Sequence, residues 1–416
     1  MIFLKNHIKV VKAREVLDSR FRPTIEVKVS TENYSAKASV PSGASTGKYE
    51  TVELRDKDGS VNTAIKNVNT IIKKNILNKN VTEQEKLDDL MCKLDGTENK
   101  KNLGGNAILG TSLAIARVRA LELGKTLYHS IGENRLIPVP FMNIINGGKH
   151  AKNNLQFQEF MIVPRFKTFS ETLVKSKEIF KELGKVITLK YGKPTLGDEG
   201  GFAPNISLPQ EALDLMQKAV DNLGYAKQVK FAIDVAASEF YKSEIFGQEG
   251  HYLYNNKKLA HHKMIEVYEE LINNYPIISI EDPFEQEQFE HFAEFTKNFG
   301  RKLQIIGDDL LVTNLERLDT AYHKKSCNAL LLKVNQIGTL TEAIDAGRFA
   351  LMNHWNVMVS HRSGETMDTF ISDLAVGIGC GQIKAGAPSK PERLAKYERL
   401  VEIEKELGKN GEFAKL

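Results

Sequence analysis

The feature that most constrains the fold is a set of eight short β-branched runs in the second part of the chain, separated by amphipathic helical stretches. Short apolar strands that alternate with helices predict βα units and a parallel sheet. Eight such runs in about 250 residues match a TIM-type (β/α)8 barrel. The runs are Phe141–Ile145, Phe157–Val163, Phe231–Val235, Ile277–Ile280, Leu303–Ile306, Leu330–Val334, Val357–Ser360 and Gln382–Lys384.

Between the second and third runs we expect a long helical stretch that has no strand of its own. One helix there has clear boundaries, with Ser207 as its N-cap, Pro209 in its first turn and Gly224 at its end. Proline at the start and glycine just past the end are typical of helix termini.

The first quarter of the chain has a different pattern. Thr24–Val29 alternates polar and apolar residues, which predicts a half-buried strand, and a second extended stretch ends at Val40-Pro41. Helices are expected at 61–78, 82–94 and 106–123, the last with Asn106 as N-cap and Gly124 as C-cap.

The predicted fold class is therefore α/β, with an N-terminal α+β capping domain over residues 1–135 and a C-terminal barrel over residues 138–416.

Composition narrows the class of protein further. The chain has 416 residues, a net charge of +4 and only short basic runs, which argues against a nucleic-acid-binding protein. Three cysteines without a C-x-x-C pair fit a reducing compartment. We find no signal peptide and no apolar run of the ~18 residues that cross a bilayer. The expectation is a cytoplasmic protein with no membrane span.

Acidic residues follow three consecutive barrel strands. Asp234, Glu281 and Asp308 stand at the carboxyl ends of their runs. In a TIM barrel these ends meet at one mouth, where reactive groups lie. Three converging carboxylates suit a hard cation such as Mg²⁺, whereas each one alone is equally well explained as a helix N-cap.

Two lysines also end strands. Lys333 follows three leucines, and Lys384 ends the last run. A lysine at the rim acts as a general base only if desolvation or neighbouring positive charge lowers its pKa, and metal ions with Lys384 would supply that charge. A lysine that reaches solvent is the alternative.

Three loops carry further candidate residues. His361-Arg362-Ser363 offers a guanidinium and a hydroxyl suited to phosphate. Gly197–Gly201 places two acids in a glycine-rich loop, and Pro41–Gly47 is a small-residue loop suited to folding over a ligand. For the last two, a simple turn and an ordinary surface loop are equally good explanations.

Taken in order, these motifs resemble the enolase family over essentially the whole chain. The segments PSGASTG, GDEGG, SIEDPF, GDDL, LLLKVNQIGTL, VSHRSGET and GQIKAGAP carry the resemblance. It implies a Mg²⁺-dependent lyase that interconverts 2-phosphoglycerate and phosphoenolpyruvate.

The resemblance also implies a role for each candidate residue. Asp234, Glu281 and Asp308 are expected to hold one Mg²⁺, and Ser45 a second that arrives with substrate. Lys333 is expected to be the C2 base, and Glu199 the acid for the leaving hydroxyl, assisted by Glu159. The remaining expected substrate contacts are His150, Gln158, His361, Arg362, Ser363 and Lys384.

Some positions depart from the family pattern. Phe21-Arg22 replaces a usual Gly-Asn pair, Met367 a usual Glu, and Glu398 a common Asn. These positions leave turn geometry and the subunit interface open, so a homodimer and an octamer both remain. Two other functions remain as alternatives: a related superfamily enzyme with another carboxylate substrate, and a non-catalytic protein or a secondary cell-surface role.

Overall fold

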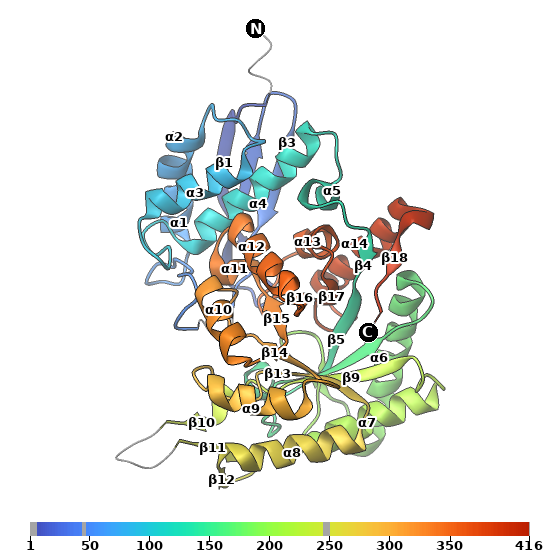
Figure 1. Ribbon diagram of the computed structural model, residues 1–416. Coiled ribbons are helices and arrows are strands. Elements are labelled where there is room, and N and C mark those ends of the chain that lie inside the picture. The colour runs from blue at the N-terminus through green and yellow to red at the C-terminus, as the bar shows by residue number, and fades with distance from the viewer. Residues whose placement is uncertain (1–5, 44–46, 244–249, 416) are drawn as a thin grey trace.

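Eight strands close into a barrel, as the alternating runs predict. The computed structural model describes residues 6–43, 47–243 and 250–415. The strands follow the order β17-β16-β15-β14-β13-β9-β6-β5, and a β17–β5 pairing closes the ring (Figure 1). Their bounds are β5 Val139–Asn146, β6 Glu159–Pro164, β9 Val229–Asp234, β13 Ile277–Glu281, β14 Gln304–Gly307, β15 Ala329–Leu332, β16 Asn356–Ser360 and β17 Gly381–Lys384.

One strand runs against the predicted direction. β6 is antiparallel to both β5 and β9, whereas the other barrel pairs are parallel. The link from β5 to β6 holds only a 3-10 turn at Gly148–His150, and a parallel return normally needs a crossover helix. The reversal places the first residue of β6, Glu159, opposite the last residue of β9, Asp234.

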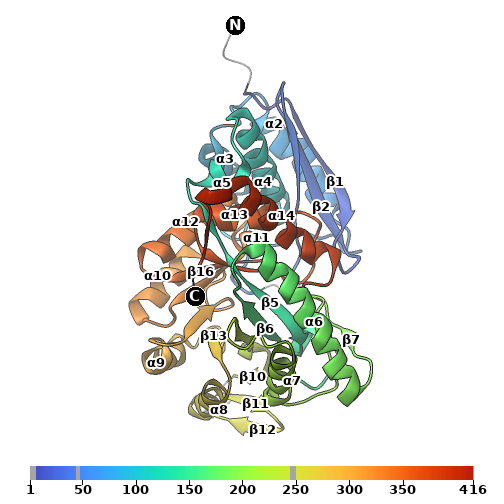
Figure 2. The ribbon, with the colours of Figure 1, turned by 90° about the vertical axis from the view of Figure 1, so that its right-hand side faces the viewer.

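Helices surround the barrel on its outer side (Figures 1 and 2). They are α6 Phe169–Tyr191, α7 Pro209–Asn222, α8 His261–Asn274, α9 Phe289–Phe299, α10 Leu315–Lys324, α12 Leu340–Met352, α13 Phe370–Ile378 and α14 Pro391–Leu407. The short helix α11 Val334–Ile337 follows β15 at the mouth of the barrel and contacts α4 Gly105–Glu122. A small sheet of β10 Tyr241–Lys242, β11 His251–Tyr254 and β12 Lys257–Leu259 lies beside α8, and β4 Leu136–Ile137 pairs with β18 Glu412–Phe413.

The stretch between β6 and β9 differs from its prediction in two details. It contains two short strands, β7 Thr195–Leu196 and β8 Phe202–Ala203, and β8 pairs with β5. Ser207 is not the N-cap of α7, because Leu208 occupies that position. The Glu211 carboxylate accepts from both backbone N–H groups at 3.0 Å, which is how a third-position glutamate satisfies a helix start.

The N-terminal part is an antiparallel sheet covered by helices, which lies above the barrel in Figure 1. The sheet consists of β1 Val10–Leu17, β2 Pro23–Ser30 and β3 Ser35–Ser39, and the helices are α1 Asn62–Asn67, a π-helical turn Val68–Ile72, α2 Lys73–Ile76, α3 Gln84–Asp95, α4 Gly105–Glu122 and α5 Leu127–Ile131.

Helix α4 packs on β2 and β3 and is buried along most of its length. Asn106 is not its N-cap: Gly104 is, at φ +99, and the Asn106 Oδ1 accepts from Leu54 N instead.

The interior of the barrel is layered because alternate side chains of each strand point inward. The inward set of β14 runs from Gln304 through Ile306 toward Asp308, and that of β17 runs from Gln382 to Lys384. The middle layer is apolar and buried, and consists of Val139, Phe141, Met161, Val163, Ala232, Ile306, Ala329, Leu331 and Met358, joined by Ala414. Polar layers therefore lie at both ends of the barrel.

Hydrogen bonds and an ion pair join the N-terminal part to the barrel. Arg117 of α4 holds both oxygens of Asp368, with N–O distances of 2.6 and 2.8 Å. Thr51 Oγ1 donates to the Asn335 carbonyl at 2.9 Å, just beyond β15. Ser42 forms a β-bridge with Gly364. The N-terminal part is thus fixed against the carboxyl ends of the barrel strands.

The departures from the family pattern lie at the surface or beside it. Phe21 is 84 % exposed and has a φ of +58, a left-handed conformation that glycine adopts more easily. Met367 is 61 % exposed, and Glu398 lies 3.8 Å from Lys177.

Candidate active site

One cavity of about 50 Å³ lies where the carboxyl ends of the barrel strands meet the N-terminal part. Most of the residues singled out from the sequence line it. Glu281 is not in the lining but contacts it through Lys384, and Ser45 lies outside the described residues. The predicted residues in the lining are His150, Gln158, Glu159, Glu199, Asp234, Asp308, Lys333, His361, Arg362, Ser363 and Lys384.

Lys384 lies at the centre of the acidic cluster. Its Nζ lies 2.9 Å from both Glu281 oxygens, 3.1 Å from Glu159 Oε2 and 3.4 Å from Asp234 Oδ2. Burial alone would lower the pKa of this lysine, but the surrounding carboxylates raise it well above its usual value. Lys384 is therefore a fixed positive charge that holds three strands' carboxylates together.

Lys333 forms a short ion pair with Asp308 Oδ2. Burial lowers the pKa of Lys333, but the carboxylates around it, Asp308 first and then Glu281, raise it, and the pKa of this lysine lies above its ordinary value. The lowered pKa expected from the sequence is thus not produced by the chain's own groups, even though Lys384 and Arg362 act in that direction. The neighbouring Asp308 keeps Lys333 protonated.

Asp308 is positioned by two residues that the sequence did not single out. Gln336 Nε2 donates to Asp308 Oδ1 at 2.9 Å, and Asp282 Oδ1 accepts from the Asp308 backbone N–H at 3.0 Å. Asp282 Oδ2 also accepts from Asp309 N at 2.7 Å. Burial, followed by the charge of Asp308, raises the pKa of Asp309 to about 7.

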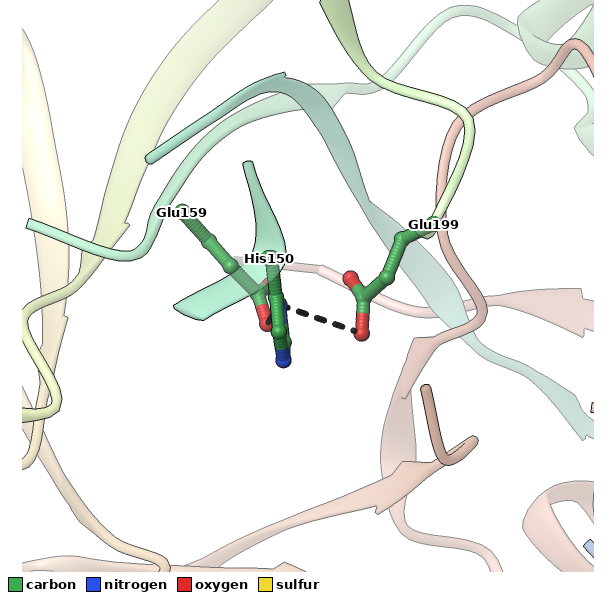
Figure 3. Close-up of side chains that lie close together, drawn as sticks. All are labelled: His150, Glu159 and Glu199. Atoms are coloured by element: carbon green, nitrogen blue, oxygen red, sulfur yellow. Dashed lines mark ion pairs between the residues drawn. The ribbon is translucent and has the colours of Figure 1, made fainter. Parts of the chain in front are cut away.

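A second group, formed by His150, Glu159 and Glu199, shares Glu159 with the cluster around Lys384 (Figure 3). His150 Nδ1 lies 3.5 Å from Glu159 Oε1 and 3.6 Å from Glu199 Oε1. Glu159 starts β6, whereas Glu199 lies between β7 and β8, in a turn where Gly200 has a φ of +85. Glycine suits position 200 because it adopts this left-handed conformation easily and because a Cβ atom there would clash with Ser389.

The two glutamates have opposite pKa shifts. Burial and the nearby Glu199 charge raise the pKa of Glu159 well above its usual value. Burial would raise the pKa of Glu199 too, but His361 and His150 bring it below its usual value. Two carboxylates this close are expected to share one proton, and the opposite directions of their pKa shifts favour Glu159 as the group that holds it.

The cationic side of the cavity is built around Arg362. Its Nη1 donates to Glu50 Oε2 and to Asn335 Oδ1, each at 2.9 Å. The fully buried Arg393 donates to the backbone carbonyls of Arg362 and Ser363 at 2.7 Å, and also contacts His361 Nδ1. Arg393 thereby fixes the backbone of the loop from 361 to 363.

Glu50 and Arg393 are the main omissions of the sequence-based site. Glu50 comes from the N-terminal part, a few residues beyond the Pro41–Gly47 loop, and lines the cavity. Its position so soon after that loop is the only signal for it in the sequence. Arg393 lies in the Glu392–Lys396 segment, where no pattern marks it as buried.

The donor set fits divalent cations. Among the described lining residues, eight carboxylates face four lysine and arginine side chains, so the cavity has an excess of acid. Two groups have ligand atoms within 4.8 Å of one another: His150, Glu159 and Glu199, and Asp282, Asp308 and Asp309. The predicted trio Asp234, Glu281 and Asp308 is not one of these groups, and Asp234 and Glu281 both contact Lys384 Nζ, at 3.4 and 2.9 Å.

A barrel with carboxylates, lysines and a paired arginine at its mouth defines a class of acid–base enzymes that act with a metal ion. Comparisons with known proteins give the family. Residues 8–131 match the family model "Enolase, N-terminal domain", and residues 134–415 match "Enolase, C-terminal TIM barrel domain". The chain belongs to the enolase family, and is a lyase.

Curated relatives named "Enolase" align along nearly the whole chain. The protein of Methanopyrus kandleri is 51% identical over 416 residues, which covers 97% of this chain and 96% of the relative. That of Methanocaldococcus jannaschii is 51% identical over 412 residues, with 96% of both covered. That of Mastigamoeba balamuthi is 48% identical over 431 residues, with 98% and 97% covered. In the part of the chain that the structure describes, no helix has the length and apolar character of a membrane span.

Proposed function

We propose that this protein catalyses the reversible, Mg²⁺-dependent dehydration of 2-phospho-D-glycerate to phosphoenolpyruvate, in glycolysis and gluconeogenesis. The observation that carries the proposal is the placement of a lysine and two neighbouring glutamates in the lining of one cavity. Lys333 lies on the β15 side, and Glu159 with Glu199 lies on the β6 and β8 side. Dehydration needs a base and an acid on either side of two adjacent carbons.

In the proposed mechanism Lys333 Nζ accepts the C2 proton and must therefore be neutral. When bound, Mg²⁺ would be held by Asp234, Glu281 and Asp308, with a second ion at Ser45, and would supply positive charge that balances the charge growing on the substrate carboxylate. As a metal ligand, Asp308 would hold the Lys333 proton less strongly.

Glu199 donates a proton to the C3 hydroxyl, which leaves as water while the C2–C3 double bond forms. The resting proton lies on Glu159, so Glu159 acts as the proton reservoir for Glu199, with His150 beside both carboxylates.

The remaining residues bind substrate. Arg362 and Ser363 hold the phosphate, for which Arg362 exchanges its Glu50 contact for phosphate oxygens. Lys384 pairs with the substrate carboxylate, and Gln158 and His361 line the pocket. Burial lowers the pKa of His361 to about 4, so this side chain is neutral and acts as a hydrogen-bonding partner.

The organisation of the chain follows from these roles. We propose an N-terminal capping domain over 1–135 and a catalytic barrel over 138–416, assembled as a homodimer or octamer in the cytoplasm. The small-molecule substrate would enter between the two parts, where Glu50 meets Arg362.

The test follows phosphoenolpyruvate by its ultraviolet absorbance after 2-phosphoglycerate is added. Activity that disappears with a chelator and returns with Mg²⁺ is expected. A folded, Mg²⁺-supplied protein that leaves 2-phosphoglycerate unchanged would favour a superfamily enzyme with a different carboxylate substrate, or a non-catalytic role.

A further inference from the structure

A second and larger cavity, of about 510 Å³, lies at the opposite end of the barrel. It is formed where the parallel strands begin, at Lys230, Ser279, Gln304, Asn356 and Gln382, and where the antiparallel β6 ends, beside Arg165. The apolar middle layer of the barrel separates it from Lys333 and the acidic cluster. The proposed function makes no use of this cavity.

The lining of this cavity is strongly cationic. It contains five basic side chains and, among the described residues, no Asp or Glu: Arg165, Lys227, Lys230, Arg301 and Lys302. None of these five belongs to an ion pair between described residues, although Arg165 Nε donates to the Ala414 carbonyl at 2.7 Å. A concave surface lined by one sign of charge concentrates counter-ions.

The floor of the cavity is a layer of neutral polar side chains. The amides of Gln304 and Gln382 bond each other at 2.9 Å, and Asn356 Nδ2 donates to Gln304 Oε1 at 2.7 Å. Gln304 Nε2 also donates to Ser279 Oγ at 3.3 Å. These mutual bonds close the end of the barrel, so a ligand rests on an ordered polar surface instead of entering the core.

We propose that this cavity binds a small molecule that carries two or more phosphate groups. Its volume lies in the range of about 300–1,000 Å³ that is usual for small-molecule sites. Lysine and arginine are the side chains that proteins use for phosphate, and five cations with no acidic partner among the described residues exceed what a single monoanion would neutralise. The described lining offers no carboxylate or histidine, so its charged side chains are all cations that suit the binding of an anion.

The test is a calorimetric titration of inorganic pyrophosphate into the full-length protein without divalent ions. One equivalent is expected to bind. The double variant K230Q/R301Q should bind about tenfold more weakly or worse, because two charge-assisted contacts are lost. A matched control, K57Q/K66Q, removes the same charge from exposed positions of the N-terminal part that belong to no ion pair between described residues, and should bind like the wild type.

A further variant separates this cavity from the active site. R362Q removes the proposed phosphate contact there and should leave pyrophosphate binding unchanged, while K230Q/R301Q should retain the wild-type dehydration rate. The proposal is overturned if the wild type binds no pyrophosphate, if R362Q abolishes binding, or if K57Q/K66Q weakens it as much as K230Q/R301Q does.

Discussion

The Nζ of Lys384 lies 2.9 Å from each carboxylate oxygen of Glu281. A single ammonium group thereby links β17, the last strand of the barrel, to β13, which lies four strands away around the ring. Both side chains are buried in the acidic cluster. A carboxylate left in this cluster without a cation would be costly, since unpaired buried charge is strongly unfavourable. Lys384 is accordingly important for the integrity of the site, apart from its proposed role in substrate binding.

Mg²⁺ is expected to stabilise the fold. A ligand that binds only the folded state at one hundred times its Kd adds about 2.7 kcal/mol to the free energy of unfolding. Asp234→Asn, which removes one proposed ligand, should reduce this gain, and thermal unfolding with and without Mg²⁺ measures it. Asp89→Asn, on the exposed face of α3, is the control and should keep the full Mg²⁺ effect.

Lys333→Ala should abolish exchange of the C2 proton of 2-phosphoglycerate with solvent, because no other group assigned to the site accepts that proton. Loss of about a thousandfold is expected for removal of a general base. Proton exchange in deuterated buffer, followed by NMR, is the measurement. Lys149→Ala, which alters another lysine of the same cavity that pairs with Glu239, should leave exchange near the wild-type rate. Persistent exchange in Lys333→Ala would disprove the base assignment.

Glu199→Gln should block loss of the C3 hydroxyl while C2 exchange continues. Glu159→Gln should slow the same step, because it removes the group that holds the resting proton. Parallel measurements of C2 exchange and phosphoenolpyruvate formation distinguish the two steps. Glu239→Gln serves as the control, since Glu239 lines the cavity and pairs with Lys149 instead of with the proposed acid–base groups. If Glu199→Gln lost both steps together, the acid role would be wrong.

Arg393→Lys should raise KM for 2-phosphoglycerate by about tenfold while kcat changes less. Lysine keeps the positive charge but loses the planar fork that holds the carbonyls of Arg362 and Ser363. Arg393 would act through the loop from 361 to 363, which is proposed to hold the phosphate, so a separate measurement of KM and kcat is the informative readout. A fall in kcat of about tenfold, with KM unchanged, would contradict this positioning role.

Asp368→Asn should destabilise the protein at neutral pH by about 3 kcal/mol, near the lower end for a broken buried pair because Arg117 is partly exposed. Burial alone would raise the pKa of Asp368, but the charge and hydrogen bonds of Arg117, together with the backbone N–H groups of Ser39 and Phe370, bring it below the ordinary value. Between the pKa of Asp368 in the folded protein and its higher pKa in the unfolded chain, the unfolded state binds more protons. The stabilisation is therefore present above about pH 4, near the unfolded-state pKa, and is lost as the pH falls through the folded-state pKa.

Denaturant unfolding across pH 2–8, roughly the range over which carboxyl groups titrate, tests this dependence. The difference in free energy of unfolding between the wild type and Asp368→Asn should decrease as the pH is lowered. Asp89→Asn breaks an exposed pair with Lys93 and should cost less than about 1 kcal/mol. A difference in free energy of unfolding that stays constant with pH would show that Asp368 contributes through packing or hydrogen bonds alone.

Much of the barrel and its mouth could be predicted from the sequence, for a physical reason. Each strand is a local apolar run, and the carboxyl ends of parallel strands must meet, so the sequence alone places Asp234, Asp308 and Lys333 together. The direction of β6 could not be predicted, because it depends on the absence of a crossover helix in the twelve-residue link that precedes it. The apolar run of β6 does not itself show whether the strand is parallel or antiparallel to its neighbours.

The parts of the site that escaped prediction depend on contacts between distant segments. Glu50 meets Arg362 only because the N-terminal part lies over the barrel, and Gln336 reaches Asp308 only through the turn after β15. The direct contact between Lys333 and Asp308 could not be predicted for the same reason, since the sequence does not show that these two side chains are partners.

The alternation of inward side chains has a consequence for how this chain can change over evolution. Insertion or deletion of one residue within β14 or β17 would turn every later inward side chain outward. Such a change would remove side chains of that strand from both the apolar layer and the charged layer beyond it, and a substitution at one position would not restore them. Strand lengths in the barrel should therefore be invariant among descendants, and changes in length should accumulate in the connecting loops, where they leave the pleat untouched.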